Sequence, residues 1–304
     1  MDISILIVSF NTCKALRECL RALPEAVGDL SHEIIVVDNA SEDGTAEMLS
    51  REHPQISLIA NRENIGFARA CNQAIKASSG GCLLFLNSDT IARPLSLGAL
   101  AGYLSAHPRV GAVGPRLYAC DGRLSRSCFR FPSLTRPYLN FRLVQYFLGE
   151  KFALPYARQD PIFSRGGPAD WLSAACLLVR RQALEKVGPF DERYFMYFED
   201  IDLCRRLRNS GWDVVYWPKA EVLHSSGASS HGQKARLRVE DQRSRLIYFS
   251  THHPGLGFRL QCFGVFLAAL MRSARWLACF KFKRLGVEAR IMRLVLIGNY
   301  QEPL

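Results

Sequence analysis

Residues 3–10 read ISILIVSF, a nearly continuous apolar run that is rich in β-branched side chains. Such a run is typical of a strand that is buried on both faces of a parallel sheet. A helical pattern follows, in which Leu16, Leu20 and Leu23 recur at helical spacing and Pro24 is expected to end the helix. The start of the chain therefore predicts a strand followed by a helix that packs against it.

The same alternation of strand and helix recurs along the chain. Further strands are predicted at 33–37, 56–59, 82–86, 174–179 and 212–217, the last ended by Pro218, and helices at Thr45 onward, 66–77, 181–187 and 199–209. The segment 118–170 is rich in arginine, aromatic residues and proline, and we expect long, partly helical connections there. This order predicts an α/β fold with a mostly parallel central sheet that is flanked by helices.

Composition and charge narrow the class of protein. The 304 residues are 48% hydrophobic and 22% charged, which excludes a disordered or fibrous chain. The net charge is +11, and residues 234–304 carry +9 of it, with thirteen Lys and Arg against four Asp and Glu. This excess favours an anionic partner, which could be a nucleic acid, a membrane surface or a phosphorylated substrate. No nucleic-acid-binding motif is present, so we expect no nucleic acid as partner.

Several catalytic motifs are absent from the sequence. No GxGxxG follows the first strand, and no GxxxxGK[ST], GxSxG or HExxH occurs. The ten cysteines are scattered without a CxxC pair, which indicates free thiols in a reducing cytoplasm. The N-terminal MDIS lacks the basic start of a signal peptide, and the longest apolar run, 262–271, is about half of a membrane span. We therefore expect a cytoplasmic protein.

Two aspartates follow directly after predicted strands. Asp38 ends the second strand and Asp89 comes just after the fourth, at the sheet edge where α/β proteins bind ligands. Each alone could merely cap a turn, but two in one layer favour a ligand site. His224 follows the strand-like residues 221–223 and could be a structural histidine. Asp89, His224 and two phosphate oxygens would together make a suitable site for Mg²⁺ or Mn²⁺.

A second acidic group comprises Asp191, Glu192 and residues 199–202. Acids at a helix start suit the helix dipole, which accounts for Glu199 and Asp202 without any catalytic role. The five large residues at 194–198, YFMYF, are not explained in this way. They could enclose a partly desolvated carboxylate, which is the environment that tunes a general base.

These stretches together resemble a known family, the family 2 inverting glycosyltransferases with a GT-A fold, most closely the bacterial rhamnosyltransferase-like branch. The resemblance covers about residues 2–230 and lies in ILIVSFN (5–11), VVDNASEDGT (36–45), NIGFARACN (64–72), LFLNSDT (84–90), GPFDE (188–192), YFEDIDLCRRL (197–207), GW (211–212) and HSSGAS (224–229). The order and spacing of these motifs are more specific than any one of them.

The resemblance implies a role for individual residues. Asp38 would bind the base of a nucleotide-sugar, and Asn64, Arg69 and Asn87 would line the nucleotide pocket. Asp89 matches the last acid of the family's DXD metal motif, and His224 a late metal ligand. Asp200 matches the catalytic base. Trp171, Asp191 and Glu199 would lie on the acceptor side.

The resemblance also implies an activity and a division of the chain. Residues 1–230 would form a GT-A catalytic domain, with a nucleotide-sugar half (1–117) and an acceptor half (118–230). Residues 231–304 would form a basic amphipathic helical tail. The enzyme would move a sugar, with dTDP-rhamnose as the first choice of donor, to a saccharide or polyprenyl-diphosphate-linked acceptor in cell-surface polysaccharide biosynthesis. Another donor such as UDP-galactofuranose, or an inactive binding protein, remain alternatives.

Some positions depart from the family pattern. Asn87 replaces the first acid of the DXD motif, and Ser88 stands where proline is common in this branch. Ser173 and Ala174 replace x-Gly of a Trp-x-x-Gly-Ala motif that begins at Trp171. The basic tail has two open interpretations: it attaches the protein peripherally to the inner face of the plasma membrane, or it packs on the catalytic domain or a second subunit.

Overall fold

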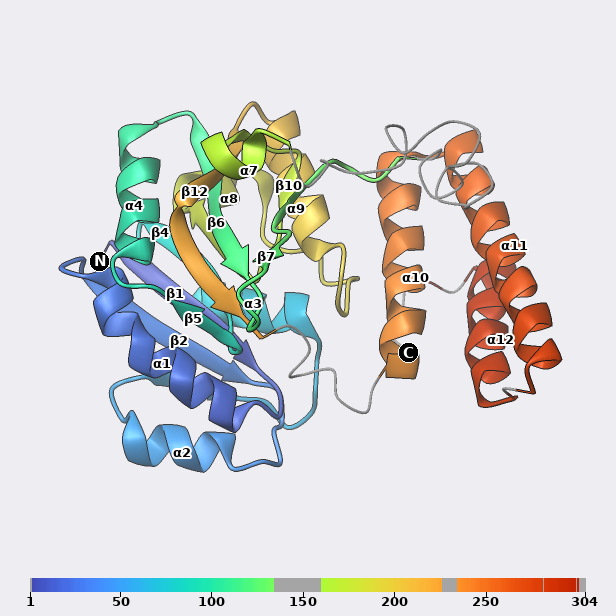
Figure 1. Cartoon of the computed structure of the whole chain (residues 1–304), viewed down its shortest axis with the longest axis horizontal. Helices are drawn as coiled ribbons and strands as arrows, with labels where there is room; N and C mark the ends of the chain where they lie inside the picture. The colour runs from blue at the N-terminus through green and yellow to red at the C-terminus, as the bar shows by residue number, and fades with distance from the viewer. Residues whose placement is uncertain (1, 134–159, 226–233, 281, 299, 301–304) are drawn as a thin grey trace. The chain divides into compact units, whose positions relative to one another are not determined.

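The structure is a computed structural model that describes residues 2–133, 160–225, 234–280, 282–298 and 300. The chain divides into two compact units (Figure 1). Unit 1 comprises Met1–Phe131, Pro155–Asp191 and Asp200–Ser229, and unit 2 comprises Pro132–Leu154, Glu192–Glu199 and Ser230–Leu304.

The parallel part of the sheet in unit 1 has the strand order β3-β2-β1-β4. These strands are β1 (Ile3–Ser9), β2 (His32–Asp38), β3 (Ser57–Ala60) and β4 (Cys82–Asn87). In the strand register Ser9 is level with Asp38, and Val8 is level with Asn87. The carboxyl ends of β2 and β4 therefore reach the same edge of the sheet, with β1 between them.

The other part of the sheet mixes strand directions. The order continues as β4-β11-β6-β12-β5, with β5 (Thr90–Ala92), β6 (Val110–Tyr118), β11 (Cys176–Arg180) and β12 (Asp213–His224). β11 is antiparallel to both neighbours, β12 is parallel to β6, and β5 is antiparallel to β12. Short strands complete it: β7 (Leu124–Ser125) on β6, β9 (Gly167–Pro168) on β12, and the separate pair β8 (Cys128–Phe129) and β10 (Trp171–Leu172).

Helices cover both faces of this sheet. α1 (Cys13–Val27), α2 (Thr45–Glu52) and α4 (Ser96–Ala106) share one apolar core with Ile3, Ile5 and Ile7 of β1. On the opposite face, Phe67 of α3 (Phe67–Ala77) and Phe85 of β4 both meet the ring of Phe190 edge-on. The remaining helices in the described part of unit 1 are α7 (Ile162–Arg165), α8 (Arg181–Val187) and α9, which runs from Glu199, a unit 2 residue, to Asn209. The predicted α/β class is confirmed.

Two predicted boundaries at prolines are wrong. Pro24 lies inside α1, which ends at Val27 before Gly28, whose φ is +67°. A proline in the last turns removes one hydrogen bond only, so the left-handed glycine ends the helix instead. Pro218 lies inside β12, where the pairing with β6 shifts register between Trp217 and Glu221. This irregularity accommodates a residue that cannot donate to the ladder, as prolines in sheets require.

The C-terminal helices form a core of their own within unit 2. They are α10 (Lys234–His252), α11 (Leu256–Ala278) and α12 (Phe282–Ile297). Their shared core contains Val239, Leu246, Val265, Ala269, Ile291 and Leu294. The predicted helical C-terminal extension is present. Within the 118–170 segment, residues 134–159 lie outside the described part of the chain.

Candidate active site

Asp38 is buried at the carboxyl end of β2, with a side chain that is 3% exposed. Its carboxylate accepts hydrogen bonds from the hydroxyl of Ser41 and, at 3.2 Å, from the Ser41 backbone N–H. Ser41 in turn accepts a hydrogen bond from the N–H of Asn11 at 2.8 Å, and Asn11 accepts one from Glu42. The loop after β2 is therefore fastened to the loop after β1, which holds the Asp38 carboxylate in one orientation.

Asn64 and Arg69 lie around the start of α3. The Asn64 side chain is half-buried and accepts a hydrogen bond from the N–H of Gly66 at 3.0 Å, while Arg69 is exposed on the first turns of α3. Gly66 has φ +88°, a left-handed conformation that favours glycine, and its carbonyl accepts from Asn39, the neighbour of Asp38. The start of α3 is thus tied to the loop after β2.

Asn87, Asp89 and His224 meet at the end of β4. The Oδ1 atom of Asp89 lies 3.2 Å from Nε2 of His224, and Nδ2 of Asn87 lies 3.3 Å from the same nitrogen. The pairing of β5 with β12 sets this contact, because Thr90 is level with His224, and the N–H of Ser225 donates to the Asp89 carbonyl. Two residues 135 positions apart, Asp89 and His224, are therefore brought together by strand pairing.

The chemistry of this group suits a hard divalent cation. A carboxylate and an imidazole are available, and two ligands of one octahedral Mg²⁺ lie about 3 Å apart, close to the Asp89–His224 separation. Within the described part of the chain, no three His, Cys, Asp or Glu side chains gather as a metal site. The residues present therefore fit a cation that completes its shell with oxygens from a substrate phosphate and water.

Asp200 lies at the start of α9, and its carboxylate is held by backbone groups. Oδ2 accepts a hydrogen bond from the N–H of Ala174 at 3.2 Å, and Oδ1 accepts one from the N–H of Ile201 at 2.8 Å. The carbonyl of Ala175 accepts a hydrogen bond from the N–H of Asn87 at 3.0 Å. Asp200 is therefore linked through two adjacent residues to the end of β4, next to Asp89.

Burial raises the pKa of Asp200 from its usual 3.8 to about 6, although hydrogen bonds from Ala174 and Ile201 oppose this shift. Desolvation disfavours the charged carboxylate, whereas N–H donors stabilise it, and here desolvation is larger. A carboxyl group with a pKa near 6 is ionised at neutral pH and is basic enough to accept a proton. Just before α9, Tyr197 and Phe198 have φ of +69° and +70°, a strained backbone that is frequent at functional sites.

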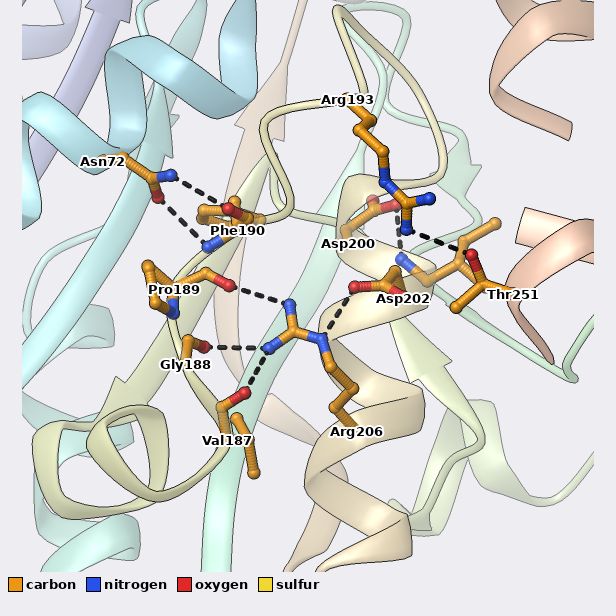
Figure 2. A network of polar contacts seen from close by, with 11 residues as sticks. Asn72, Val187, Gly188, Pro189, Phe190, Arg193, Asp200, Asp202, Arg206 and Thr251 are labelled. Carbon is orange, nitrogen blue, oxygen red and sulfur yellow. Dashed lines mark hydrogen bonds and ion pairs between the residues drawn. The ribbon is translucent and has the colours of Figure 1, made fainter. Parts of the chain in front are cut away.

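Arg206 fixes the helix that carries Asp200 (Figure 2). Its guanidinium donates to the carbonyls of Val187, Gly188 and Pro189 at 2.8 to 2.9 Å and to the Asp202 carboxylate at 2.7 Å. The next residue, Phe190, exchanges two hydrogen bonds with the side-chain amide of Asn72 on α3, at 2.9 and 3.0 Å. The turn after α8 is thereby joined to both α9 and α3.

The three residues expected on the acceptor side fall in different surroundings. Trp171 of β10 stacks on Phe129 with ring centroids 4.3 Å apart, and its Nε1 donates to the Arg130 carbonyl at 3.0 Å. Asp191 is half-buried at the end of the turn after α8, and Glu199, at the start of α9, is 6% exposed. Glu199 and Asp191 belong to different compact units.

Asn72 and Arg206 were not predicted to shape the site. No role was predicted from the sequence for either residue. A signal was available, since Arg206 stands four residues after Asp202, the spacing at which an Asp–Arg pair forms on a helix. The carbonyls that Arg206 binds follow α8, however, and no pattern in the sequence points to them.

The mixed, mostly parallel sheet, with acids at the carboxyl ends of its strands, has the GT-A fold. The sequence profile described as "Glycosyl transferase family 2" matches residues 4–188, and the chain belongs to this family.

Curated relatives include two bacterial rhamnosyltransferases. The N-acetylglucosaminyl-diphospho-decaprenol L-rhamnosyltransferase of Mycobacterium tuberculosis is 35% identical over 233 residues, which cover 73% of this chain and 76% of the relative. The rhamnosyltransferase WbbL of Escherichia coli is 37% identical over 224 residues, covering 63% of this chain and 82% of the relative. This chain is therefore a rhamnosyltransferase-like member of the family and a transferase.

Solved structures show the same fold at low sequence identity. A mannosyltransferase from Pyrobaculum calidifontis, in complex with GDP-Man and Mn²⁺, has a TM-score of 0.54 and 17% identity and covers 98% of this chain and 86% of its own. TarS from S. aureus has a TM-score of 0.55 and 16% identity and covers 91% of this chain and 44% of its own. These likenesses establish the GT-A fold.

Proposed function

We propose that this protein transfers L-rhamnose from dTDP-rhamnose to a saccharide on a polyprenyl diphosphate, with inversion, in cell-surface polysaccharide biosynthesis. The observation that carries the proposal is the desolvated Asp200 carboxylate, linked through Ala174 and Ala175 to Asn87 at the end of β4. The two rhamnosyltransferase relatives support the sugar, and the decaprenol-linked substrate in the name of the first supports the polyprenyl-linked acceptor.

In the proposed reaction, Asp200 accepts the proton of an acceptor hydroxyl while that oxygen attacks the anomeric carbon. The bond from the anomeric carbon to the diphosphate breaks on the opposite side, and the nucleoside diphosphate leaves with the electron pair. A single displacement of this kind inverts the anomeric centre. Holding the base, the hydroxyl and the leaving group in line supplies several kcal/mol of the barrier reduction.

The remaining residues bind and orient the donor and the acceptor in this proposal. Asp38, with Asn64, Arg69 and Asn87, binds the nucleotide, and Trp171, Asp191 and Glu199 face the acceptor. Asp89 and His224 would hold Mg²⁺ or Mn²⁺, which when bound supplies positive charge that stabilises the departing diphosphate. Residues 1–230 are then the catalytic domain, within which 1–117 bind the donor and 118–230 the acceptor, in the cytoplasm.

A panel of donors tests the proposal. The full chain is mixed with dTDP-, UDP- and GDP-sugars and Mn²⁺, and its melting temperature is measured, because a ligand that binds the folded state raises it. We expect the largest shift with dTDP-rhamnose, followed by rhamnose transfer to a lipid-linked N-acetylglucosaminyl diphosphate. A larger shift with a UDP-sugar would show that the donor is that UDP-sugar and not dTDP-rhamnose. If the protein neither hydrolysed nor transferred any of the donors, the proposal of an active transferase would be contradicted.

A further inference from the structure

α11 exposes an apolar stripe along its whole length. The stripe comprises Leu256, Leu260, Phe263, Leu267, Leu270 and Leu277, which are between 40% and 72% exposed. Their spacing of three, four or seven residues places them on one face of a helix. Large apolar side chains that are exposed in a continuous row mark a surface that contacts something else.

The stripe lies opposite the face that packs in unit 2. Gln261, Val265 and Ala269 of α11 are buried, and Val265 and Ala269 belong to the core shared with α10 and α12. Position 265 lies roughly half a helical turn from 263 and 267 around the axis. α11 is therefore apolar on two faces: one packs in the core shared with α10 and α12, and the side chains of the stripe on the other are 40% to 72% exposed.

The exposed charges of α11 and α12 are all positive. The two helices contain one acid, Glu288, which is 1% exposed and is bound by Arg238 at 2.7 Å and Arg272 at 3.0 Å. The exposed cations are Arg259, Arg275, Arg284, Arg290 and Arg293. A second copy of this surface would bring like charges together, whereas an anionic surface would complement them.

We propose that this α11 stripe, together with the exposed cations of α11 and α12, docks the protein on an anionic membrane surface, with α11 lying in the plane of the interface. α11 has 23 residues, and an 18-residue window within it has a mean hydropathy of 1.2, enough by length and composition for a membrane span. However, α12 packs alongside it, so a spanning α11 would draw Arg290 and Arg293 toward the hydrocarbon, which is unfavourable. A basic helix with an exposed apolar face is the usual form of an interfacial helix.

The membrane proposal extends the proposed function, since a polyprenyl-linked acceptor resides in a bilayer, but its test needs no substrate. The full chain is floated with vesicles of phosphatidylcholine, with or without phosphatidylglycerol. The double variant Phe263→Glu, Leu270→Glu is compared with a matched double variant in unit 1, Leu95→Glu, Leu124→Glu, which also replaces exposed leucines. Thermal unfolding checks that all the variants fold.

We expect the wild type and the unit 1 variant to bind anionic vesicles and to bind neutral ones at least about tenfold less, with binding weakened by salt. The α11 variant should lose about tenfold or more of its binding. Equal binding by all three proteins would overturn the proposal. So would resistance of the bound protein to alkaline carbonate, which indicates a spanning helix, or a dimer that the α11 variant abolishes without any vesicle binding. If the protein did not transfer rhamnose, the proposed function would fail, but the vesicle-binding result would still stand because it is measured without substrate.

Discussion

Oδ2 of Asp200 accepts a hydrogen bond from the backbone N–H of Ala174 at 3.2 Å, across 26 positions of the sequence. Ala174 lies two residues before β11, which pairs with β4, and the neighbouring Ala175 carbonyl accepts a hydrogen bond from the N–H of Asn87. The start of α9 is thus anchored to the strand end that carries the Asn87–Asp89 turn. A base on α9 and a diphosphate site after β4 would keep a fixed separation because rigid backbone joins them.

Replacing Asp200 by asparagine should remove the proton acceptor and keep the shape of the side chain. The amide oxygen of asparagine can still accept from Ala174, so we expect unchanged donor affinity by calorimetry and a turnover lowered about 10²–10⁴-fold. Asp213→Asn, at an exposed aspartate that starts β12, is the matched control and should keep full turnover. Normal turnover in the Asp200 variant would remove the catalytic role proposed for this carboxylate.

The pH dependence of transfer should reflect the raised pKa of Asp200. Because burial raises this pKa to about 6, the group is protonated and cannot act as a base below that pH. We expect turnover to rise about tenfold per pH unit up to about pH 6 and then to level off. An ordinary aspartate, with its pKa of 3.8, would give a profile that is flat from about pH 4, and that result would contradict a desolvated base.

The same pKa predicts an effect on stability that needs no substrate. The folded-state pKa of Asp200 lies above the usual 3.8, so the folded protein binds more protons between about pH 4 and pH 6. Stability contributed by this group is therefore lost as the pH rises through that window. We expect Asp200→Asn to match the wild type near pH 4 and to exceed it by about 3 kcal/mol at pH 8 in denaturant unfolding, because one unit of pKa difference corresponds to about 1.4 kcal/mol. If the variant were more stable than the wild type by the same amount at every pH, this explanation would be rejected.

The strands and their order along the chain could be predicted because burial on both faces leaves apolar runs such as residues 3–10. The helices at 181–187 and 199–209 could be placed from their apolar spacing and the glycines that follow them. The prolines misled the prediction, since Pro24 and Pro218 are tolerated where the structure can spare one hydrogen bond. Boundaries of this kind depend on tertiary contacts, which the conformational preferences of neighbouring residues do not reveal.

The contacts of the candidate site were predicted less completely. That Asp38 and Asp89 lie at strand ends follows from the sequence, because parallel strands end at one edge of a sheet. The contact of Asp89 with His224 depends on the pairing of β5 with β12, two strands that are far apart in the chain. The family resemblance suggested this pair, whereas the local sequence shows only a lone histidine after a strand.

Removing the Asp89 carboxylate should weaken metal-dependent binding of the nucleotide. Asp89→Ala and His224→Ala each delete one of the two side chains that approach to 3.2 Å. We expect either change to lower affinity for the nucleotide with Mn²⁺ by at least about tenfold, and a chelator to bring the wild type to the same level. Asp121→Ala, at an exposed aspartate, is the control. Unchanged affinity by calorimetry in both variants would reject this pair as the metal site.

Arg206→Lys should show how far the orientation of α9 matters for catalysis. Arg206 donates to the three carbonyls of Val187, Gly188 and Pro189 and to Asp202, and a lysine ammonium cannot reach all four acceptors. We expect the free energy of unfolding to fall by about 1–3 kcal/mol, because hydrogen bonds from a charged donor are lost. Turnover should fall because α9 carries Asp200. Nucleotide affinity should change little, because the residues proposed to bind the donor lie at the strand ends and not on α9.

The matched control for Arg206→Lys is Arg109→Lys, at an exposed arginine before β6, which should leave stability within about 0.5 kcal/mol of the wild type. A purely structural role for Arg206 would lower stability alone. A positioning role also lowers turnover at a temperature where the variant is fully folded, and it leaves the pH midpoint near 6 unchanged because Asp200 itself is intact. Full turnover of a folded Arg206→Lys protein would show that the contacts of Arg206 are not needed for catalysis by Asp200, and it would contradict the positioning role.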